Sequence, residues 1–307
     1  MLKPLKVACF GEVMIELMFD DLPADAKANI AGDTFNTAVY LRRVLDRAHS
    51  VSYVTALGDE RLSEKIARAI AHHRIGTEHI RRIKDKLPGV YSITLDAHGE
   101  RSFSYWRSDS AARRMFETVH GPDFQCLEGF DVIYASGISL AILPDATRLA
   151  FLEWLKGYRK NGGRFAYDSN YRPTLWESRE LAAKRTDMAW TRCDIALPSL
   201  DDEMALFAEE ESDVIARFKV YGHATGAIKR GSRGPVLLGS TEAPNQSYPV
   251  VSKVVDTTAA GDSFCGGYLA SFLNYADSGK AAVAGHQLAS AVIQSKGAIV
   301  QTDHLAR

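Results

Sequence analysis

Residues 254–264 carry the side chains best suited to chemistry. An apolar stretch leads through small residues directly into a run with helical periodicity. Small side chains let a ligand approach the backbone, and the free amides of a helix N-terminus bind anions such as phosphate. Asp262 would repel a phosphate there, unless its task is to take a proton from a hydroxyl that attacks the phosphate. The segment therefore predicts a phosphoryl-transfer site with Asp262 as the base.

Other interpretations of these motifs stay open. Asp262 would serve equally well as the N-cap of the helix that follows, because aspartate often has this structural role. The sequence contains no G-x-x-x-x-G-K-[ST] motif, and no G-x-G-x-x-G follows the first apolar stretch. Residues 137–141 are close to a hydrolase nucleophile elbow around Ser139, but Ala141 stands where the second glycine belongs. We interpret that segment as a turn at the end of a strand.

Short apolar segments alternate with longer amphipathic segments along most of the chain. Strands are expected at residues 6–10, 51–57, 131–135, 164–167, 195–197 and 225–229. Helices are expected at residues 33–46, 60–74, 145–160, 201–208, 262–275 and 280–296. This alternation predicts an α/β fold with a mainly parallel central sheet and helices on both faces.

Residues 89–95 and 101–106 break this rhythm, because polar and apolar side chains alternate around the turn at 96–100. They predict a half-exposed β-hairpin, which joins residues 14–19 and the loop around Ala28 in a small sheet. The hairpin is either an ordinary sheet edge or a lid that excludes water from a reaction. Such a lid would comprise about residues 12–31 and 88–108 of one domain that spans residues 1–307.

The composition narrows the class of protein. The chain has 307 residues, of which 46% are hydrophobic and 24% charged, as in soluble globular enzymes. A formal charge of -1 creates no general attraction to nucleic acid or to an anionic membrane. Secretory and transmembrane segments are not expected, nor is a disulfide or zinc framework from Cys9, Cys126, Cys193 and Cys265. We therefore expect a cytoplasmic protein with free thiols.

Four motifs in register resemble those of the ribokinase-like (phosphofructokinase-B) carbohydrate kinases. Residues 256–262, D-T-T-A-A-G-D, resemble the family signature D-T-x-G-A-G-D, with Ala259 in place of the first glycine. Residues 31–38 resemble its N-terminal G-G-x-x-x-N-x-A, and Gly58-Asp59 and residues 227–234 also match in order. The resemblance spans about residues 6 to 300 and implies the three-layer ribokinase-like fold with a small β-sheet lid.

Within this family, the sequence is most similar to the subgroup that acts on a sugar acid, 2-keto-3-deoxygluconate. The similar segments are residues 168–172, 175–176, 197–203, 256–264, 287–290 and 297–299. An alanine at position 259 is itself a feature of the subgroup. The resemblance implies ATP-dependent phosphorylation of the C6 hydroxyl of this acid, giving the 6-phosphate and ADP.

The resemblance also implies catalytic roles around Asp262. This carboxylate would deprotonate the C6 hydroxyl, whose oxygen attacks the γ-phosphorus of ATP in line. The backbone amides from Ala259 through Ala260 and Gly261 to Asp262 would stabilise the developing charge, aided by the helix dipole.

Sugar contacts are carried over from the family in two groups. Gly32, Asp33 and Asn36 would bind sugar hydroxyls, although Asp33 would also suit the N-cap of the first helix. An acid substrate needs further cationic or phenolic donors, because its carboxylate must be neutralised. The candidates for this second group, with the neighbouring amide of Asn170, are Tyr91, Tyr105, Arg107 and Arg172.

The nucleotide and metal sites are also implied by the resemblance. Mg²⁺ would bridge the phosphates of ATP, and a role for a monovalent cation such as K⁺ stays open. The family motif N-x-x-E aligns with residues 199–202, which leaves Asp202 and the adjacent Glu203 as candidates for organising the metal. A helix N-cap with an acidic first turn explains this segment equally well. The residues expected near the nucleotide are Ser199, Lys229, Gly231, Gly234 and His286.

Three other functions remain as alternatives. A kinase for a neutral sugar such as fructose or ribose would not need the arginine and tyrosine cluster. A non-catalytic sugar-binding protein would not need the Gly261-Asp262 pair, and a serine hydrolase would have to use Ser139. The expected partners are a small sugar acid and ATP, without nucleic acid or membrane. We also expect a homo-oligomer, because the lids of this family often pair between subunits.

Overall fold

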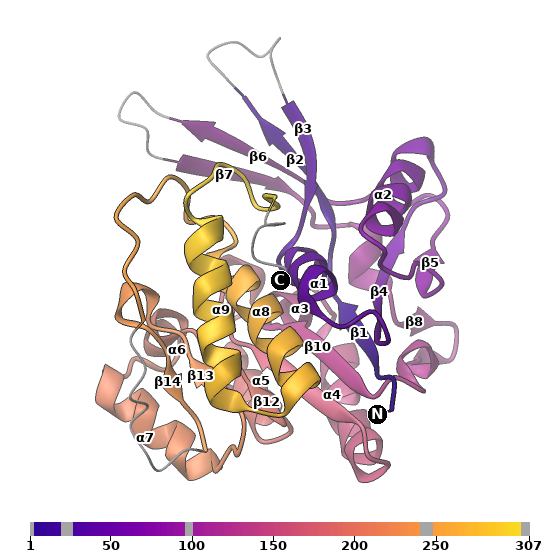
Figure 1. The fold of residues 1–307 in the computed structure, drawn as a ribbon. Coiled ribbons are helices and arrows are strands. Elements are labelled where there is room, and N and C mark those ends of the chain that lie inside the picture. Colours follow the sequence, from indigo (N-terminus) through magenta and orange to yellow (C-terminus); the bar gives the residue numbers. More distant parts are fainter. Residues whose placement is uncertain (1–2, 20–26, 96–100, 240–247, 302–307) are drawn as a thin grey trace.

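The computed structural model describes residues 3–19, 27–95, 101–239 and 248–301 (Figure 1). A central sheet lies between two layers of helices, and a second, smaller sheet projects from one end of the molecule. This arrangement confirms the expected α/β fold with a mainly parallel sheet.

The central sheet has six parallel strands in the order β12-β11-β10-β1-β4-β5. Their bounds are β1 (Lys6–Phe10), β4 (Ser50–Leu57), β5 (Ile80–Arg82), β10 (Val132–Ser136), β11 (Arg164–Asp168) and β12 (Ile195–Ala196). The chain builds outward from β1 to β5 and then returns to start the other half at β10. Ligands of such sheets bind where the strand order reverses, which is here the carboxyl ends of β1 and β10.

Helices cover both faces of this sheet because its strands are apolar on both sides. One layer holds α1 (Asp33–Val44), α2 (Arg61–His72), α8 (Ala260–Tyr275) and α9 (Ser278–Val292). The other holds α3 (Gly137–Ala141), α4 (Asp145–Lys160), α5 (Arg179–Trp190), α6 (Leu200–Phe207) and α7 (Glu211–Tyr221). In β1, Ala8 and Phe10 pack toward the second layer, whereas Val7 and Cys9 pack toward the first.

Differences from the expected elements have local causes. Helix α8 begins at Ala260, two residues earlier than expected, because Ala259 is its N-cap in a left-handed conformation with φ 60°. Helix α5 escaped the sequence analysis because its buried face includes the polar residues Arg185 and Thr186, which obscure the apolar periodicity. The strand expected at 225–229 is shorter, and it pairs antiparallel with a neighbour as β13 (Ala227–Ile228) and β14 (Val236–Leu237).

The smaller sheet has the strand order β3-β2-β6-β7. Its strands are β2 (Met14–Met18), β3 (Lys27–Ala31), β6 (Val90–Leu95) and β7 (Arg101–Trp106). The segment around Ala28 is therefore a strand rather than a loop, paired antiparallel with β2. The hairpin of β6 and β7 forms as expected. Its turn at 96–100 and part of the proposed lid, at 20–26, lie outside the described residues.

The four cysteines are free thiols, which confirms the expectation for them. Within the described ranges, the protein has no helix that is both long enough and apolar enough to cross a membrane. The same part of the chain contains no group of three or more acidic, histidine or cysteine side chains arranged to hold a metal ion.

Candidate functional site

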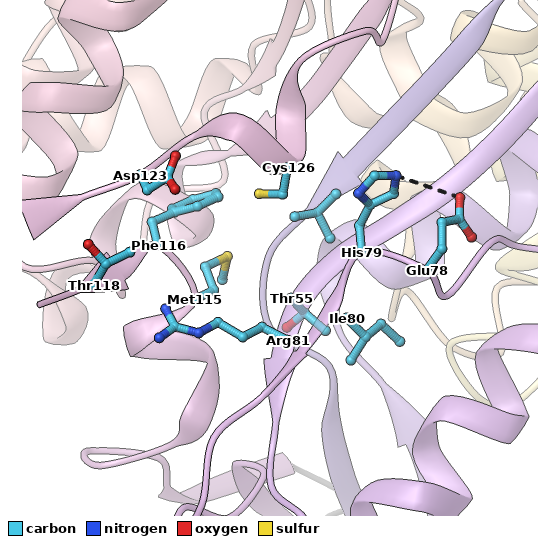
Figure 2. A pocket seen from close by; sticks show the side chains of 11 residues that line it. Thr55, Glu78, His79, Ile80, Arg81, Met115, Phe116, Thr118, Asp123 and Cys126 are labelled. Atoms are coloured by element: carbon cyan, nitrogen blue, oxygen red, sulfur yellow. Dashed lines mark ion pairs between the residues drawn. The ribbon is translucent and has the colours of Figure 1, made fainter. Parts of the chain in front are cut away.

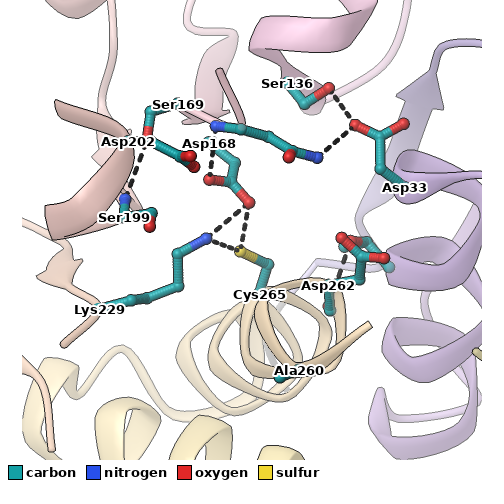
Figure 3. A network of polar contacts seen from close by, with 12 residues as sticks. Asp33, Ser136, Asp168, Ser169, Ser199, Asp202, Lys229, Ala260, Asp262 and Cys265 are labelled. Carbon is teal, nitrogen blue, oxygen red and sulfur yellow. Dashed lines mark hydrogen bonds and ion pairs between the residues drawn. The ribbon is translucent and has the colours of Figure 1, made fainter. Parts of the chain in front are cut away.

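Polar side chains from both halves of the sheet meet where its strand order reverses (Figure 3). Asp33 comes from the start of α1 and Asp262 from the first turn of α8. Ser136 ends β10, and Asp168 ends β11. These residues are far apart in the sequence, and the parallel sheet brings them to one edge.

Asp33 faces this site and does not cap its own helix. The N-cap of α1 is Gly32, and the Asp33 carboxylate instead accepts hydrogen bonds from the Ser136 hydroxyl and from Asn170 Nδ2, the latter at 2.9 Å. Burial raises the pKa of Asp33, and the hydrogen bond from Ser136 opposes this shift. A side chain at Gly32 would place its Cβ 2.3 Å from the carbonyl oxygen of Glu12. The N-cap interpretation of Asp33 is therefore wrong.

Asp262 likewise does not cap α8, because Ala259 occupies the N-cap position. Its Oδ2 accepts a hydrogen bond from Asn36 Nδ2 at 2.9 Å, and its backbone carbonyl accepts one from the Thr37 hydroxyl at 3.1 Å. Both donors belong to α1. The carboxylate is therefore held by the neighbouring helix, and the N-cap interpretation of Asp262 is also wrong.

The electrostatic surroundings of Asp262 favour a base. Burial raises the pKa of Asp262 to about 8, and the negative charge of Asp33 contributes to the same shift. The hydrogen bond from Asn36 and the positive charge of Lys229 act in the opposite direction. A carboxylate with a pKa near neutrality accepts a proton more readily than an ordinary aspartate does.

Lys229 places a positive charge close to the start of α8. Its Nζ is 2.6 Å from Asp168 Oδ2 and 3.4 Å from Cys265 Sγ, and it lies 3.6 Å from the position that a Cβ on Gly261 would take. Burial alone would lower the pKa of Lys229, but the charge of Asp168 holds it above its ordinary value. An anion bound at this helix N-terminus would face both the backbone amides and the ammonium group.

Asp202 and Glu203 are adjacent on α6 but face different surroundings. Asp202 Oδ1 pairs with the Arg172 guanidinium at 3.4 Å. Glu203 is fully buried and accepts hydrogen bonds from Trp190 Nε1 at 3.2 Å and Arg217 Nη2 at 2.9 Å. Burial raises the pKa of Glu203 to about 7. Since successive helix residues point about 100° apart, Glu203 faces the core, and only Asp202 remains a candidate for organising a metal.

Ser199 and Lys229 lie side by side in adjacent segments. The two are joined as an isolated parallel bridge, and Ser199 is the N-cap of α6, although its side chain makes no capping hydrogen bond. The amide of Ser199 donates to Ser169 Oγ at 2.8 Å. The structure thus brings together the residues at 199 and 229 that the sequence associated with the nucleotide.

The loop after Lys229 approaches α9 through a tyrosine. Gly231 has φ 56° and Gly234 has φ 74°, conformations that glycine adopts without strain. A Cβ on Gly234 would come within 2.5 Å of Tyr248 Cδ2, and the Tyr248 ring packs against His286 with a centroid separation of 5.2 Å. Tyr248 therefore lies against both Gly234 and His286, two of the residues expected near the nucleotide.

The tyrosines of the smaller sheet occupy directly opposed positions on β6 and β7. Tyr91 and Tyr105 are cross-strand partners whose rings stack at 5.8 Å. Tyr91 is buried and its hydroxyl donates to Glu16, whereas Tyr105 is 51% exposed. Burial raises the pKa of Tyr91, with the charge of Glu16 as the next cause. The pair thus presents one anchored and one accessible phenol.

Arg107 directly follows β7 and is buried beside Glu12, with which it forms an ion pair. Its positive charge also acts to lower the pKa of Asp33, so the guanidinium lies within electrostatic reach of the site. Arg172, the other arginine expected to bind a carboxylate, lies beside Asp202 instead. Arg107 and Arg172 thus lie on different segments, and each pairs with a carboxylate of the protein.

Three residues of this network were missed in the sequence analysis. Asp168 and Ser136 each end a strand of the parallel sheet, and a polar residue at that position is a recognisable signal. Glu12 follows an apolar strand by two residues, and an acid within an apolar stretch was the only hint of its buried ion pair.

A separate cavity of about 420 Å³ lies at the edge of the central sheet (Figure 2). It is bordered by β4, β5 and the segment around Phe116, and His79, Arg81 and Asp123 contribute polar groups to its lining. None of the site residues expected from the sequence lines it. The convergence of polar groups at the strand ends, rather than this cavity, therefore defines the candidate site.

Comparison with known proteins agrees with the motifs and with the fold. The family model described as pfkB family carbohydrate kinase matches residues 4–305. The chain is 44% identical to the 2-dehydro-3-deoxygluconokinase of Dickeya dadantii, over 96% of each chain. It is 41% identical to the enzyme of the same name from Escherichia coli K12, over 96% of this chain and 97% of that one.

A solved structure with the same fold is the 2-dehydro-3-deoxygluconokinase of Thermotoga maritima. The TM-score is 0.79 and the sequence identity 21%, with coverage of 97% of this chain and 95% of that chain. At this identity, the similarity supports the three-layer fold with a small additional sheet.

Proposed function

Because this chain belongs to the pfkB family of carbohydrate kinases, we propose that it phosphorylates the C6 hydroxyl of 2-dehydro-3-deoxygluconate with ATP. This substrate is the sugar acid also named 2-keto-3-deoxygluconate. The geometric observation that carries the proposal is the half-buried Asp262 carboxylate in the first turn of α8, near the Lys229 ammonium. A base and an anion site side by side suit phosphoryl transfer to a hydroxyl.

In the proposed reaction, the first task of the protein is to move a proton. Asp262 accepts the proton of the sugar hydroxyl, and the hydrogen bond from Asn36 keeps its carboxylate oriented. The raised pKa of Asp262 supports this role, because it reduces the difference between the pKa of the carboxyl group and the pKa of the sugar hydroxyl. Asp33, fixed by Ser136 and Asn170, is placed to bind neighbouring hydroxyls of the sugar.

The second task is to stabilise the negative charge of the transferred phosphoryl group. The amides of Gly261 and Asp262 lie in the first turn of α8, where helix amides point outward along the axis. Lys229 adds a full positive charge close to them. We place ATP with its phosphates here and its base toward Tyr248 and His286.

Magnesium fits this site as a metal held mainly by phosphate and water. The described residues contain no cage of three or more ligands, but Asp202 offers one carboxylate beside the proposed phosphate site. Mg²⁺ commonly binds through one or two carboxylates together with substrate phosphates. When bound, the ion would neutralise phosphate charge and orient the γ-phosphoryl group.

Recognition of the acid rests on arginine. Arg107 is buried and pairs with Glu12, whose backbone carbonyl lies beside Gly32, the residue before Asp33. A sugar held by Asp33 would therefore lie near this guanidinium. Arg172 is more accessible, with 51% of its side chain exposed. Since a guanidinium binds a carboxylate through two parallel hydrogen bonds, an acidic substrate gains more from these residues than a neutral sugar does.

A substrate panel tests this assignment. The wild-type enzyme should turn over 2-dehydro-3-deoxygluconate with a higher kcat/KM than fructose or ribose, measured by coupled detection of ADP. Arg107→Ala and Arg172→Ala should each lower kcat/KM for the acid about tenfold or more, in line with the loss of a charged hydrogen bond. Activity toward a neutral sugar should change much less.

A matched control is Arg68→Ala, because Arg68 is exposed on α2 and its ion pair among the described residues is with Glu64, at 3.8 Å. This variant should behave as wild type with every sugar. Faster turnover of fructose or ribose than of the acid by the wild-type enzyme would contradict the proposed substrate.

The assembly proposed for the enzyme is a homo-oligomer formed through the smaller sheet, which we propose acts as a lid. Strand β7 is an edge strand and carries the exposed aromatic residues Phe103, Tyr105 and Trp106. Exposed edges with apolar side chains favour pairing with another chain. Light scattering should therefore give at least twice the monomer mass, and Trp106→Lys should shift the mass toward the monomer. A monomeric wild-type enzyme would contradict this assembly.

A further inference from the structure

Three crossings of the chain between the central sheet and the smaller sheet meet at one point. Glu12 lies just before β2, Gly89 just before β6, and Arg107 just after β7. The Glu12 carboxylate pairs with the Arg107 guanidinium, and the Ile15 amide donates to the Gly89 carbonyl at 3.0 Å. If the smaller sheet moves relative to the central sheet, this ion pair must therefore either break or move with the smaller sheet.

The pair is buried and tightly surrounded. Glu12 is 1% exposed and Arg107 is 8% exposed. A Cβ on Gly89 would lie 2.6 Å from Glu12 Oε1 and 3.2 Å from Arg107 Cβ, so any larger residue there would displace the Glu12 carboxylate. Two charges in such surroundings depend on each other, because removing one leaves the other buried without compensation.

The guanidinium retains donors for a further partner. Across the part of the chain that the structure describes, Arg107 Nη2 faces Glu12 Oε2 in the ion pair, whereas Arg107 Nε has no hydrogen-bond partner. A guanidinium carries five N–H groups in a planar fork and binds two carboxylates through different edges. The ion pair lies next to the sugar site, because the backbone carbonyl oxygen of Glu12 would be 2.3 Å from a Cβ on Gly32, the residue before Asp33.

We propose that Glu12 is a positioning residue: it holds Arg107 at the base of the smaller sheet in the orientation that receives the carboxylate of the substrate. This inference rests on the proposed function, because it takes an acidic sugar as the ligand of Arg107. It assigns to Glu12 no contact with the substrate. Glu12 affects recognition of the acid only by orienting the Arg107 guanidinium. Because this ion pair lies at the base of the smaller sheet, the position of that sheet also affects how the acid is bound.

A double-mutant cycle tests the inference. Glu12→Ala should raise KM for the sugar acid about tenfold, as expected for directly coupled residues, and should change kcat and KM for ATP little. Glu12→Gln should lie between wild type and Glu12→Ala, because it keeps an acceptor oxygen without the charge. In an Arg107→Ala background, Glu12→Ala should have no further effect on KM for the acid.

Additive effects of the two substitutions, or an equal rise in KM for neutral sugars, would overturn the inference. The matched control is Asp109→Asn, which breaks an exposed ion pair with Lys86 two residues beyond Arg107. It should leave KM for the acid unchanged.

A measurement without turnover separates this inference from the proposed function. Glu12→Ala and Arg107→Ala should each accelerate hydrogen exchange of the Ile15 amide, and the double variant should exchange no faster than either single one. If the wild-type enzyme proves to prefer neutral sugars, the proposed substrate fails, and this exchange experiment still decides whether Glu12 positions Arg107. Unchanged exchange in both single variants would overturn the positioning role.

Discussion

Replacing Asp262 with asparagine should lower kcat by about 10³-fold, the contribution typical of a positioned general base. An asparagine side chain has the same shape and keeps an oxygen that accepts the hydrogen bond from Asn36. It cannot take the proton of the sugar hydroxyl. ATP binding should be nearly unchanged, because the backbone amides of α8 and the Lys229 ammonium remain in place. Steady-state kinetics and nucleotide titration measure the two effects separately.

The control for this variant is Asp201→Asn, an exposed aspartate at the start of α6. It should retain wild-type kcat. An Asp262→Asn enzyme with wild-type turnover would remove Asp262 from the role of base and would favour a non-catalytic or differently catalysed function.

Stability measured alongside the kinetics should show that Asp262→Asn leaves the fold intact. Burial raises the pKa of Asp262 to about 8 from its ordinary value of 3.8. Between these values, the folded protein retains a proton that the unfolded chain has released, so this group lowers stability as the pH rises through that window. Because Asp262 is only half-buried, Asp262→Asn should raise the free energy of unfolding at pH 8 by about 1 kcal/mol. The gain should disappear near pH 4.

Replacing Lys229 with methionine should lower kcat by about 10²-fold, as the loss of one charge-stabilising donor does. Methionine fills similar space but carries no charge to face the transferred phosphoryl group. The variant also leaves the Asp168 carboxylate, of which 3% is exposed, without its cationic partner. Breaking a buried ion pair in this way should cost about 3 kcal/mol of stability. Urea unfolding and steady-state kinetics measure the two losses.

The double variant Lys229→Met/Asp168→Asn separates the structural role of the pair from its chemical role. Most of the lost stability should return, because no uncompensated charge remains in the buried pair. Activity should stay low, because the positive charge near Gly261 is still missing. Recovery of kcat in the double variant would mean that Lys229 serves only to neutralise Asp168.

Local patterns in the sequence determined the main elements of this fold. The alternation of apolar and amphipathic segments identified most strands of the central sheet, since hydrophobic periodicity reflects which side of an element is buried. The change to two-residue alternation identified the hairpin of β6 and β7. The small residues before Asp262 also predicted a helix N-terminus at that point. This prediction was possible because the start of a helix depends on only a few neighbouring residues.

Contacts between distant residues were decided only by the tertiary structure. In the sequence, Asp33 and Asp262 each suit a helix cap. In the structure, Asp33 accepts a hydrogen bond from Asn170 and Asp262 accepts one from Asn36, and both donors come from other elements. The sequence could not distinguish Asp202 from Glu203 as the candidate for organising a metal. In the structure, Glu203 faces the core, where it accepts a hydrogen bond from Trp190.

The proposed base at Asp262 and the proposed anion site around it could thus be inferred from one short segment, because the features that suggest them are local. The partners that set its charge and orientation could not. Asp168 and Lys229 are in contact although they are 61 residues apart in the sequence. Glu12 and Arg107 form an ion pair although several strands and helices separate them along the chain. Such pairs depend on the strand order of the sheet and on burial, and neither leaves a pattern in the neighbouring sequence.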